Sequence, residues 1–437
     1  MRTTRSKECS LHGLDSATLR ESATDLLARM PTATHATLVT VGAATTAAAL
    51  WLLWRHLCQQ EEPQEPPHQR RRSSLADIDG SAEPRQWLCN RLPKAELHAH
   101  LHGSARLATI AELAPPGVDV KIDIDGERTL DGCFALFAAI HRTVTSLAAV
   151  RRITAEVLAD FAADNVKYLE LRTTPRALSD ASIDEYVRTV LKAFERFEGE
   201  QKAAGAPFPL VPRLLLSVDR SGTAEAADAT VALAAKLRAE DDGWGGVGGL
   251  GRYIVGVDFS GNPTKSSFAH FSRAFDAARA AGLRTVVHVA EIDDDADTSA
   301  VLAFRPDRLG HALRLSATHV AALRAAPIPI ELCPTSNMKT LKLGKLAQHP
   351  TLKRWVMEGY PVSINTDDSG VFSTTASHEL ALVAEALRLP PRRIADLAAA
   401  ALEHAFDADA AFRARYHDDV AAALDEYAAH SPEVRLG

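Results

Sequence analysis

Residues 166–172 read VKYLELR, residues 212–218 read PRLLLSV, and an amphipathic pattern with helical spacing runs between them over residues 183–197. A short apolar run, a helix and a second apolar run are typical of a parallel βα unit. The same succession fills the chain from residue 92 onward. Eight such runs predict an α/β fold, a (β/α)8 TIM barrel over residues 92–437, rather than an open sheet. The candidate strands are 96–101, 166–172, 212–218, 253–259, 284–290, 307–312, 327–333 and 361–366.

The first 91 residues differ from the barrel in composition. Residues 36–54 carry no charge and are about long enough to cross a bilayer as one helix, although Ala and Thr dilute their apolar side chains. We predict a disordered leader at 1–35, a candidate single transmembrane anchor at 36–54, and a flexible linker rich in Pro and charge at 55–91. Arg55 and Arg70–Arg72, which follow this anchor, would place the barrel in the cytosol. The alternative interpretation of the apolar segment is a processed or disordered Ala-rich leader.

The overall composition excludes several classes of protein. The 437 residues include 49 Lys and Arg against 56 Asp and Glu, a net charge of −7, so the chain lacks the basic character of a nucleic-acid-binding protein. Its five cysteines never form a CxxC pair, which argues against a disulfide framework or a cysteine-based zinc site and favours a reducing compartment. We expect a monomer that binds a small molecule.

Four of the candidate strands end in histidine or acidic residues. Such side chains are costly to bury unless they are paired or bind a metal ion. Residues two apart on a strand point to the same side, and the carboxyl ends of all barrel strands share one face. We therefore expect these side chains to converge on one site. They are His98 and His100 from the first strand, His288 and Glu291 from the fifth, His311 from the sixth, and Asp367 and Asp368 from the eighth.

This set of residue types is suited to a catalytic zinc ion. Three imidazole nitrogens, one carboxylate and a water molecule make a suitable ligand set. The adjacent Asp367 and Asp368 cannot both face the same way, so one can bind the metal while the other holds the water. Glu291 lies three residues beyond His288 and is free to reach the substrate. The strand at 253–259 is not followed by a Lys that could bridge two metals, which favours a single ion.

The residues at the strand ends lie in six motifs that together resemble those of the adenosine/AMP deaminase family. The motifs occur in the family's order, and their combination is specific although no single motif is. The resemblance implies a (β/α)8 barrel that removes the substituent at C6 of a purine by zinc-dependent hydrolysis. The motifs are KAELHAHLHGS (94–104), DFSGN (258–262), HVAE (288–291), LGHA (309–312), CPTSN (333–337) and NTDDSG (365–370).

The resemblance also implies a role for each motif residue. One zinc ion per chain would be held by His98, His100, His288 and Asp367. Glu291 would protonate the ring nitrogen beside the attacked carbon. His311 and Asp368 would orient and deprotonate the attacking water. The predicted substrate contacts are His100, His102, His141, Thr173, Thr174, Pro175, Arg176, Asp219, the backbone of Gly261, and Asp368.

Two residues point toward a nucleotide rather than a nucleoside as the substrate. His102 stands where adenosine deaminases carry an Asp near the ribose, and Arg176 follows the second strand. A carboxylate would repel a 5′-phosphate, whereas Arg is well shaped to bind one. The pattern looks like the adenosine deaminase-like branch, whose members deaminate N6-methyl-AMP, although that branch usually has Asn at the position of His102. We expect N6-methyl-AMP or an AMP-like nucleotide to give IMP and methylamine or ammonia; the alternative substrate is adenosine or deoxyadenosine, giving inosine.

Two functions of other classes also fit parts of the sequence. The first is a membrane-tethered binding protein with a catalytically dead deaminase fold. The intact Glu291 and the complete set of candidate ligands argue against it. The second is another amidohydrolase, such as an esterase or a dihydroorotase-like enzyme. The absence of a Lys after the fourth strand and the presence of Glu291 argue against that assignment.

Overall fold

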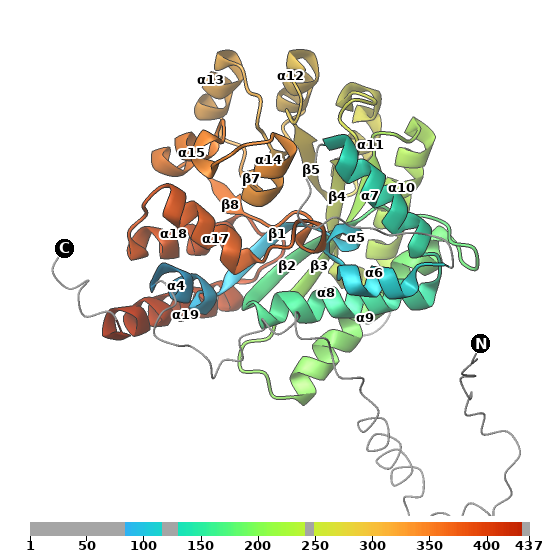
Figure 1. Cartoon of the computed structure of the whole chain (residues 1–437). Helices are drawn as coiled ribbons and strands as arrows, with labels where there is room; N and C mark the ends of the chain where they lie inside the picture. The colour runs from blue at the N-terminus through green and yellow to red at the C-terminus, as the bar shows by residue number, and fades with distance from the viewer. Residues whose placement is uncertain (1–83, 116–129, 241–248, 431–437) are drawn as a thin grey trace, which may run out of the picture. The chain divides into compact units, whose positions relative to one another are not determined.

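The computed structural model of the chain describes residues 84–115, 130–240 and 249–430 (Figure 1). The predicted leader at 1–35 and the predicted anchor at 36–54 lie outside the described residues, as does most of the predicted linker. Among the helices of the three described ranges, none combines the length and the apolar character needed to cross a membrane.

Eight strands form one parallel sheet, in which each strand pairs with the next along the chain from β1 to β8. All eight predicted strands are therefore confirmed. The seventh begins later than predicted, because Pro327 and Pro329 have no N–H group to donate to the ladder. The strands are β1 (Lys94–His100), β2 (Val166–Thr173), β3 (Val211–Asp219), β4 (Ile254–Ser260), β5 (Arg284–Val289), β6 (Arg308–His311), β7 (Ile330–Leu332) and β8 (Val362–Ile364).

The sheet curls until its last strand meets its first. An isolated parallel bridge joins Ala99 of β1 to Asp367, three residues after β8. The Asp367 N–H donates to the carbonyl of His98 at 2.9 Å, and the His100 N–H donates to the carbonyl of Asp367 at 2.9 Å. These bonds nearly close the barrel, and the arrangement is that of the predicted TIM barrel.

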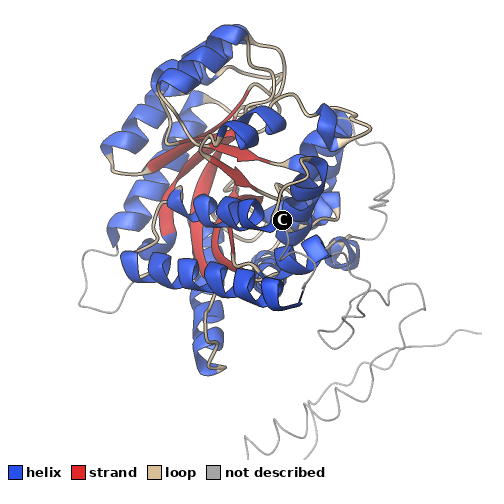
Figure 2. Cartoon of the chain, turned by 90° about the vertical axis from the view of Figure 1, so that its left-hand side faces the viewer, coloured by secondary structure: helices blue, strands red, loops and turns tan. Residues whose placement is uncertain are grey.

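Helices surround the strands on the outside (Figure 2). The helical pattern predicted over residues 183–197 is confirmed as α9 (Ile183–Ala203). The side chain of Ser182 caps α9 in a reciprocal pair with Glu185, which explains its sharp start. The helices are α4 (Pro84–Arg91), α5 (Leu101–Ser104), α6 (Leu107–Leu113), α7 (Leu130–Thr143), α8 (Leu147–Ala163), α9 (Ile183–Ala203), α10 (Ala224–Ala239), η2 (Leu250–Tyr253), η3 (Phe268–His270), α11 (Ser272–Ala280), α12 (Asp295–Phe304), α13 (Ala317–Ala325), α14 (Pro334–Thr340), η4 (Leu346–Gln348), α15 (Leu352–Glu358), α16 (Ser369–Phe372), α17 (Ala376–Ala386), α18 (Pro391–Glu403) and α19 (Ala410–His430).

The barrel begins earlier than the sequence predicted. Residues 55–91 were expected to form a flexible linker, but the last eight of them form α4. Leu88 and Cys89 on this helix are fully buried in the main hydrophobic core. The side chain of Lys94 donates hydrogen bonds to the carbonyls of Cys89 and Leu92 at 3.0 and 2.9 Å. The predicted linker was therefore too long at its C-terminal end, because a single turn of apolar residues is too short to show a helical period.

Candidate active site

A cavity of about 370 Å³ opens at the carboxyl ends of the strands. Most of the site residues predicted from the sequence line it, so the fold brings together residues from five strands, from the loops at the strand ends, including those of β4 and β8, and from α7. His98 lies just beneath the lining, with no exposed side-chain surface. The predicted residues in the wall are His100, His102, His141, Thr173, Thr174, Asp219, Gly261, His288, Glu291, His311, Asp367 and Asp368.

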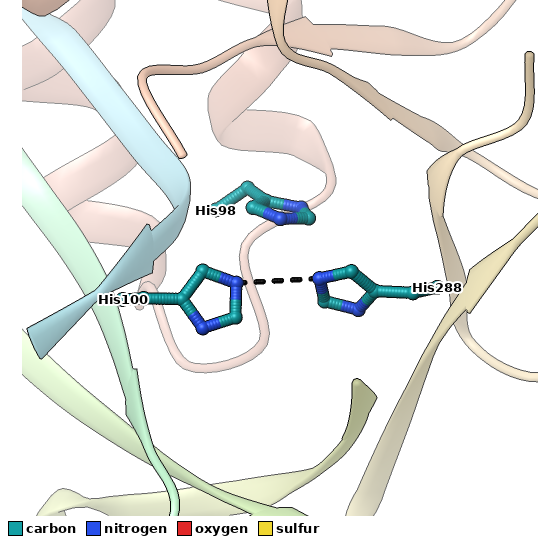
Figure 3. A group of neighbouring side chains, drawn as sticks. All are labelled: His98, His100 and His288. Carbon is teal, nitrogen blue, oxygen red and sulfur yellow. Dashed lines mark hydrogen bonds between the residues drawn. The ribbon is translucent and has the colours of Figure 1, made fainter. Parts of the chain in front are cut away.

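Three histidines face one another on the floor of the cavity (Figure 3). The Nε2 atoms of His100 and His288 are 3.2 Å apart. Oδ1 of Asp367 lies 3.4 Å from Nε2 of His98 and 3.4 Å from Nε2 of His100. Four ligands held tetrahedrally at the zinc bond lengths of about 2.0–2.1 Å would be roughly 3.3–3.4 Å apart. The spacing of these atoms therefore fits a single zinc ion.

Two of these histidines, His98 and His288, have a buried carboxylate beside Nδ1. Glu331 Oε2 lies 2.6 Å from Nδ1 of His98, and Asp258 Oδ1 lies 3.1 Å from Nδ1 of His288. The second pair is close but poorly aligned for a hydrogen bond. A carboxylate at Nδ1 keeps the proton there, which leaves a lone pair on Nε2 for a metal ion. Nε2 of His98 is buried and has no hydrogen-bond partner among the described residues, which suits an atom that binds a metal ion.

Glu331 belongs to a network of charged side chains buried inside the barrel. Its two oxygens accept hydrogen bonds from Arg172 at 3.0 Å and from Arg308 at 2.6 Å. Burial alone would raise the pKa of Glu331, but the two guanidinium groups outweigh burial and hold this pKa below its usual range. Glu331 and Arg308 are not among the site residues predicted from the sequence. For Glu331 the sequence carries a signal, which is a charged residue in the middle of an otherwise apolar strand.

A bend after β8 separates the two adjacent aspartates. Asp367 has φ 63°, a conformation that costs a residue with a side chain roughly 1–3 kcal/mol. Its Oδ2 accepts a hydrogen bond from the Ser336 hydroxyl at 2.7 Å, while Oδ1 faces the histidines. The Asp368 side chain turns toward Gly103, where a Cβ atom would lie only 1.6 Å from Asp368 Oδ1. Position 103 must therefore be glycine for Asp368 to reach the cavity.

Glu291 and His311 face the cavity on the side of β5 and β6. Glu291 Oε2 lies 3.9 Å from Nε2 of His311. Burial raises the pKa of the Glu291 carboxyl group. A raised pKa favours the protonated carboxyl group, which is the form that can give a proton to a substrate. Nε2 of His311 is also 4.0 Å from Oδ2 of Asp367, so His311, His98 and Asp367 form a second group with the geometry of a metal site.

The predicted phosphate-binding arginine is not in the cavity wall. Arg176 lies behind His102, with Nη2 3.2 Å from Nε2 of His102 and 2.8 Å from the carbonyl of Val144. Pro175 does not line the cavity either. His102 and His141 contact each other in the wall, with ring centroids 4.9 Å apart. Bidentate binding of a phosphate by Arg176 is therefore not supported, because the loop after β2 turns this side chain toward the body of the protein.

These two histidines stay neutral near physiological pH. Burial, followed by the charges of His141 and Arg176, holds the pKa of His102 well below its usual value. Burial and Arg176 lower the pKa of His141 to about 4. The positive charge on this side of the cavity therefore resides on Arg176 rather than on the imidazoles.

The profile of the family described as adenosine deaminase matches residues 93–423. The chain belongs to the adenosine deaminase family. The N6-methyl-AMP deaminase of Bos taurus is 34% identical over 349 residues, which cover 75% of this chain and 94% of the relative. The N6-mAMP deaminase of Arabidopsis thaliana is 35% identical over 350 residues, which cover 74% and 95%. The adenosine deaminase-like protein of Drosophila pseudoobscura is 36% identical over 327 residues, which cover 72% and 91%.

Solved structures of the family have the same barrel. The crystal structure of the Arabidopsis N6-mAMP deaminase superposes with a TM-score of 0.68 and 33% identity, and the match covers 77% of this chain and 99% of that one. The crystal structure of Arabidopsis ADAL complexed with IMP matches with a TM-score of 0.68 and 33% identity, and the match covers 78% of this chain and 99% of that one. Membership of the family confirms the resemblance seen in the motifs. The family profile and the deaminase relatives together identify the chain as a hydrolytic deaminase.

Proposed function

We propose that this deaminase removes the 6-methylamino group of N6-methyl-AMP, with water as the co-substrate and IMP and methylamine as products. The observation that carries the proposal is the cluster of His98, His100, His288 and Asp367 on the cavity floor, with Glu291 and Asp368 beside it. The N6-methyl-AMP deaminase of Bos taurus and the N6-mAMP deaminase of Arabidopsis thaliana align with this chain over more than nine-tenths of their own length, which supports the choice of substrate.

The four floor residues would hold one zinc ion, since their nitrogen and oxygen donors have the spacing of a tetrahedral set. Zinc supplies Lewis acidity, which makes water acidic enough to lose a proton near neutral pH. Asp368, turned into the cavity beside Gly103, would accept that proton. Glu291 would deliver a proton to the ring nitrogen beside C6 and so allow the ring to accept the electron pair of the attacking oxygen.

The nucleotide end of the substrate would lie against His102 and His141. Neither residue is a carboxylate that would repel a 5′-phosphate, and the charge of Arg176 behind His102 favours an anion there. Thr173, Thr174, Asp219 and the Gly261 backbone, which all line the cavity, would contact the remainder of the nucleotide.

The proposal is tested by measuring methylamine or ammonia release from N6-methyl-AMP, AMP and adenosine with the purified chain. We expect kcat/KM to be highest for N6-methyl-AMP and lowest for adenosine. Glu291→Gln should keep its zinc but lose at least about 100-fold in kcat, the lower range for a positioned general acid. Metal analysis should find about one zinc per chain, and His288→Ala should lose it. Higher activity on adenosine than on both nucleotides would contradict the proposed substrate.

A further inference from the structure

Behind His311, on the side away from the cavity, two polar side chains form a buried relay. Asn337 is on α14 and His349 follows η4; their exposed fractions are 1% and 5%. Asn337 Nδ2 lies 3.1 Å from Nδ1 of His311, and Asn337 Oδ1 lies 3.1 Å from Nε2 of His349. The three residues therefore form a single hydrogen-bonded chain, and the donors and acceptors along it can be assigned.

Two backbone N–H groups determine which nitrogen of His349 carries the proton. The N–H groups of Thr351 and Leu352, at the start of α15, both donate to Nδ1 of His349 at 3.3 and 3.0 Å. Backbone N–H groups can only donate, so this Nδ1 must offer a lone pair. Burial lowers the pKa of His349 to about 4, which keeps the ring neutral. Its one N–H is therefore at Nε2 and donates to Asn337.

The orientation of the Asn337 amide follows from His349. Its oxygen must face the Nε2–H of His349, since the reversed amide would place two donors against each other. Its NH2 group must then face His311 and donate to Nδ1. An Nδ1 that accepts a hydrogen bond carries no proton, so the proton of a neutral His311 is on Nε2, the nitrogen that faces Glu291 and Asp367.

We propose that His349 and Asn337 are positioning residues that fix His311 as the Nε2–H tautomer, so that His311 donates a hydrogen bond during the reaction instead of accepting the proton of water. This assignment rests on the proposed deamination, and it gives Asp368 and His311 different roles in it. The O–H bond of water breaks, its proton moves to an Asp368 oxygen, and the freed electron pair attacks C6. His311 donates its Nε2–H to the oxygen. The role expected for His311 in deprotonating water is therefore revised.

The groups at Nδ1 distinguish His311 from the other histidines of the cluster. His98 and His288 have carboxylates at Nδ1, which leaves the lone pair on Nε2 directed to the cavity floor. His311 has a donor at Nδ1 and therefore the opposite tautomer. With a proton on Nε2 it has no lone pair to offer a metal there. The second geometric group, of His98, His311 and Asp367, is thus set aside by the hydrogen bonds rather than by distance.

The tautomer is measured directly by ¹⁵N NMR of protein labelled at histidine, since protonated and unprotonated imidazole nitrogens resonate far apart. The His311 signals are assigned with a His311→Gln variant. In the wild type we expect the proton on Nε2, both in metal-free and in zinc-loaded protein, because the relay lies behind the ring. A proton on Nδ1 in the wild type would overturn the proposal without recourse to any variant.

Asn337→Asp replaces the donating NH2 by an acceptor of nearly the same shape. We expect the His311 proton to move to Nδ1 and kcat to fall about 100-fold, the effect of losing one positioned donor, with little change in KM. Asn90→Asp, on the exposed side of α4, adds the same charge and should change neither quantity. An unchanged tautomer in Asn337→Asp would refute the relay. If the wild-type protein has the expected His311 tautomer but is inactive on N6-methyl-AMP, AMP and adenosine, the proposed function is refuted and the relay is not.

Discussion

Replacing Glu331 with Gln should weaken zinc binding at a residue that does not itself touch the metal. Glu331 is fully buried and accepts from His98 Nδ1 at 2.6 Å, Arg172 at 3.0 Å and Arg308 at 2.6 Å. Glutamine has the same size but carries no charge, and one of its ends can only donate. Because both arginines also only donate, at least one of these three contacts must become a donor facing a donor.

Two magnitudes follow from these contacts. Loss of the group that orients a metal-binding histidine lowers metal affinity by about 10–100-fold, which corresponds to about 1.4–2.7 kcal/mol. Removing the negative partner of two buried arginines also destabilises the fold, by about 3–5 kcal/mol for a broken buried pair. The two effects are separable, since the first is measured on the folded protein and the second on the metal-free protein.

Zinc affinity would be measured by competition with a coloured chelator, and the free energy of unfolding by urea titration of the metal-free protein. Glu379→Gln is the matched control. Glu379 is equally buried, but it accepts from one backbone N–H group, that of Thr335, and from the hydroxyl of Thr374, which can also accept. A glutamine at this position can keep its oxygen on Thr335 while its NH2 group donates to Thr374. Burial raises the pKa of Glu379 to about 7, which already favours a neutral side chain there. Wild-type zinc affinity in Glu331→Gln would refute the claim that Glu331 positions His98.

Three further predictions concern the site and its support. Gly103→Ala should keep zinc but lose most of kcat, because its Cβ would displace the Asp368 carboxylate; unchanged kinetics would contradict this. A chain that begins at residue 92 lacks α4 and should have a lower free energy of unfolding than a chain that begins at residue 84, by at least about 1.5–3 kcal/mol, the value for burying one large apolar side chain; equal stability of the two truncations would show that α4 is dispensable. Burial lowers the pKa of Lys94 to about 8, against about 10.4 when unfolded, so the unfolded chain binds more protons between these values. The free energy of unfolding should therefore rise relative to Lys94→Met by up to about 1.4 kcal/mol per pH unit above pH 8, and parallel pH curves would exclude the depressed pKa.

Several features of this deaminase could be predicted from the sequence because they depend on local patterns. Alternating apolar runs and helical spacing gave the eight strands, and the barrel topology then placed their carboxyl ends on one face. His98 and His100 share a side because residues two apart on a strand always do. Distances confirm that these two and His288 converge as expected.

Other features depend on contacts between residues far apart in the chain, and only the tertiary structure decided them. Arg176 follows β2 as expected, but the loop turns its side chain behind His102 and out of the cavity wall. Glu331 meets His98 across 233 residues of chain. The proton assigned to His311 depends on two backbone N–H groups at the start of α15, passed on through His349 and Asn337. Periodicity in a sequence reports which face of an element is buried, whereas a tautomer is set by which donors and acceptors the fold brings against a ring.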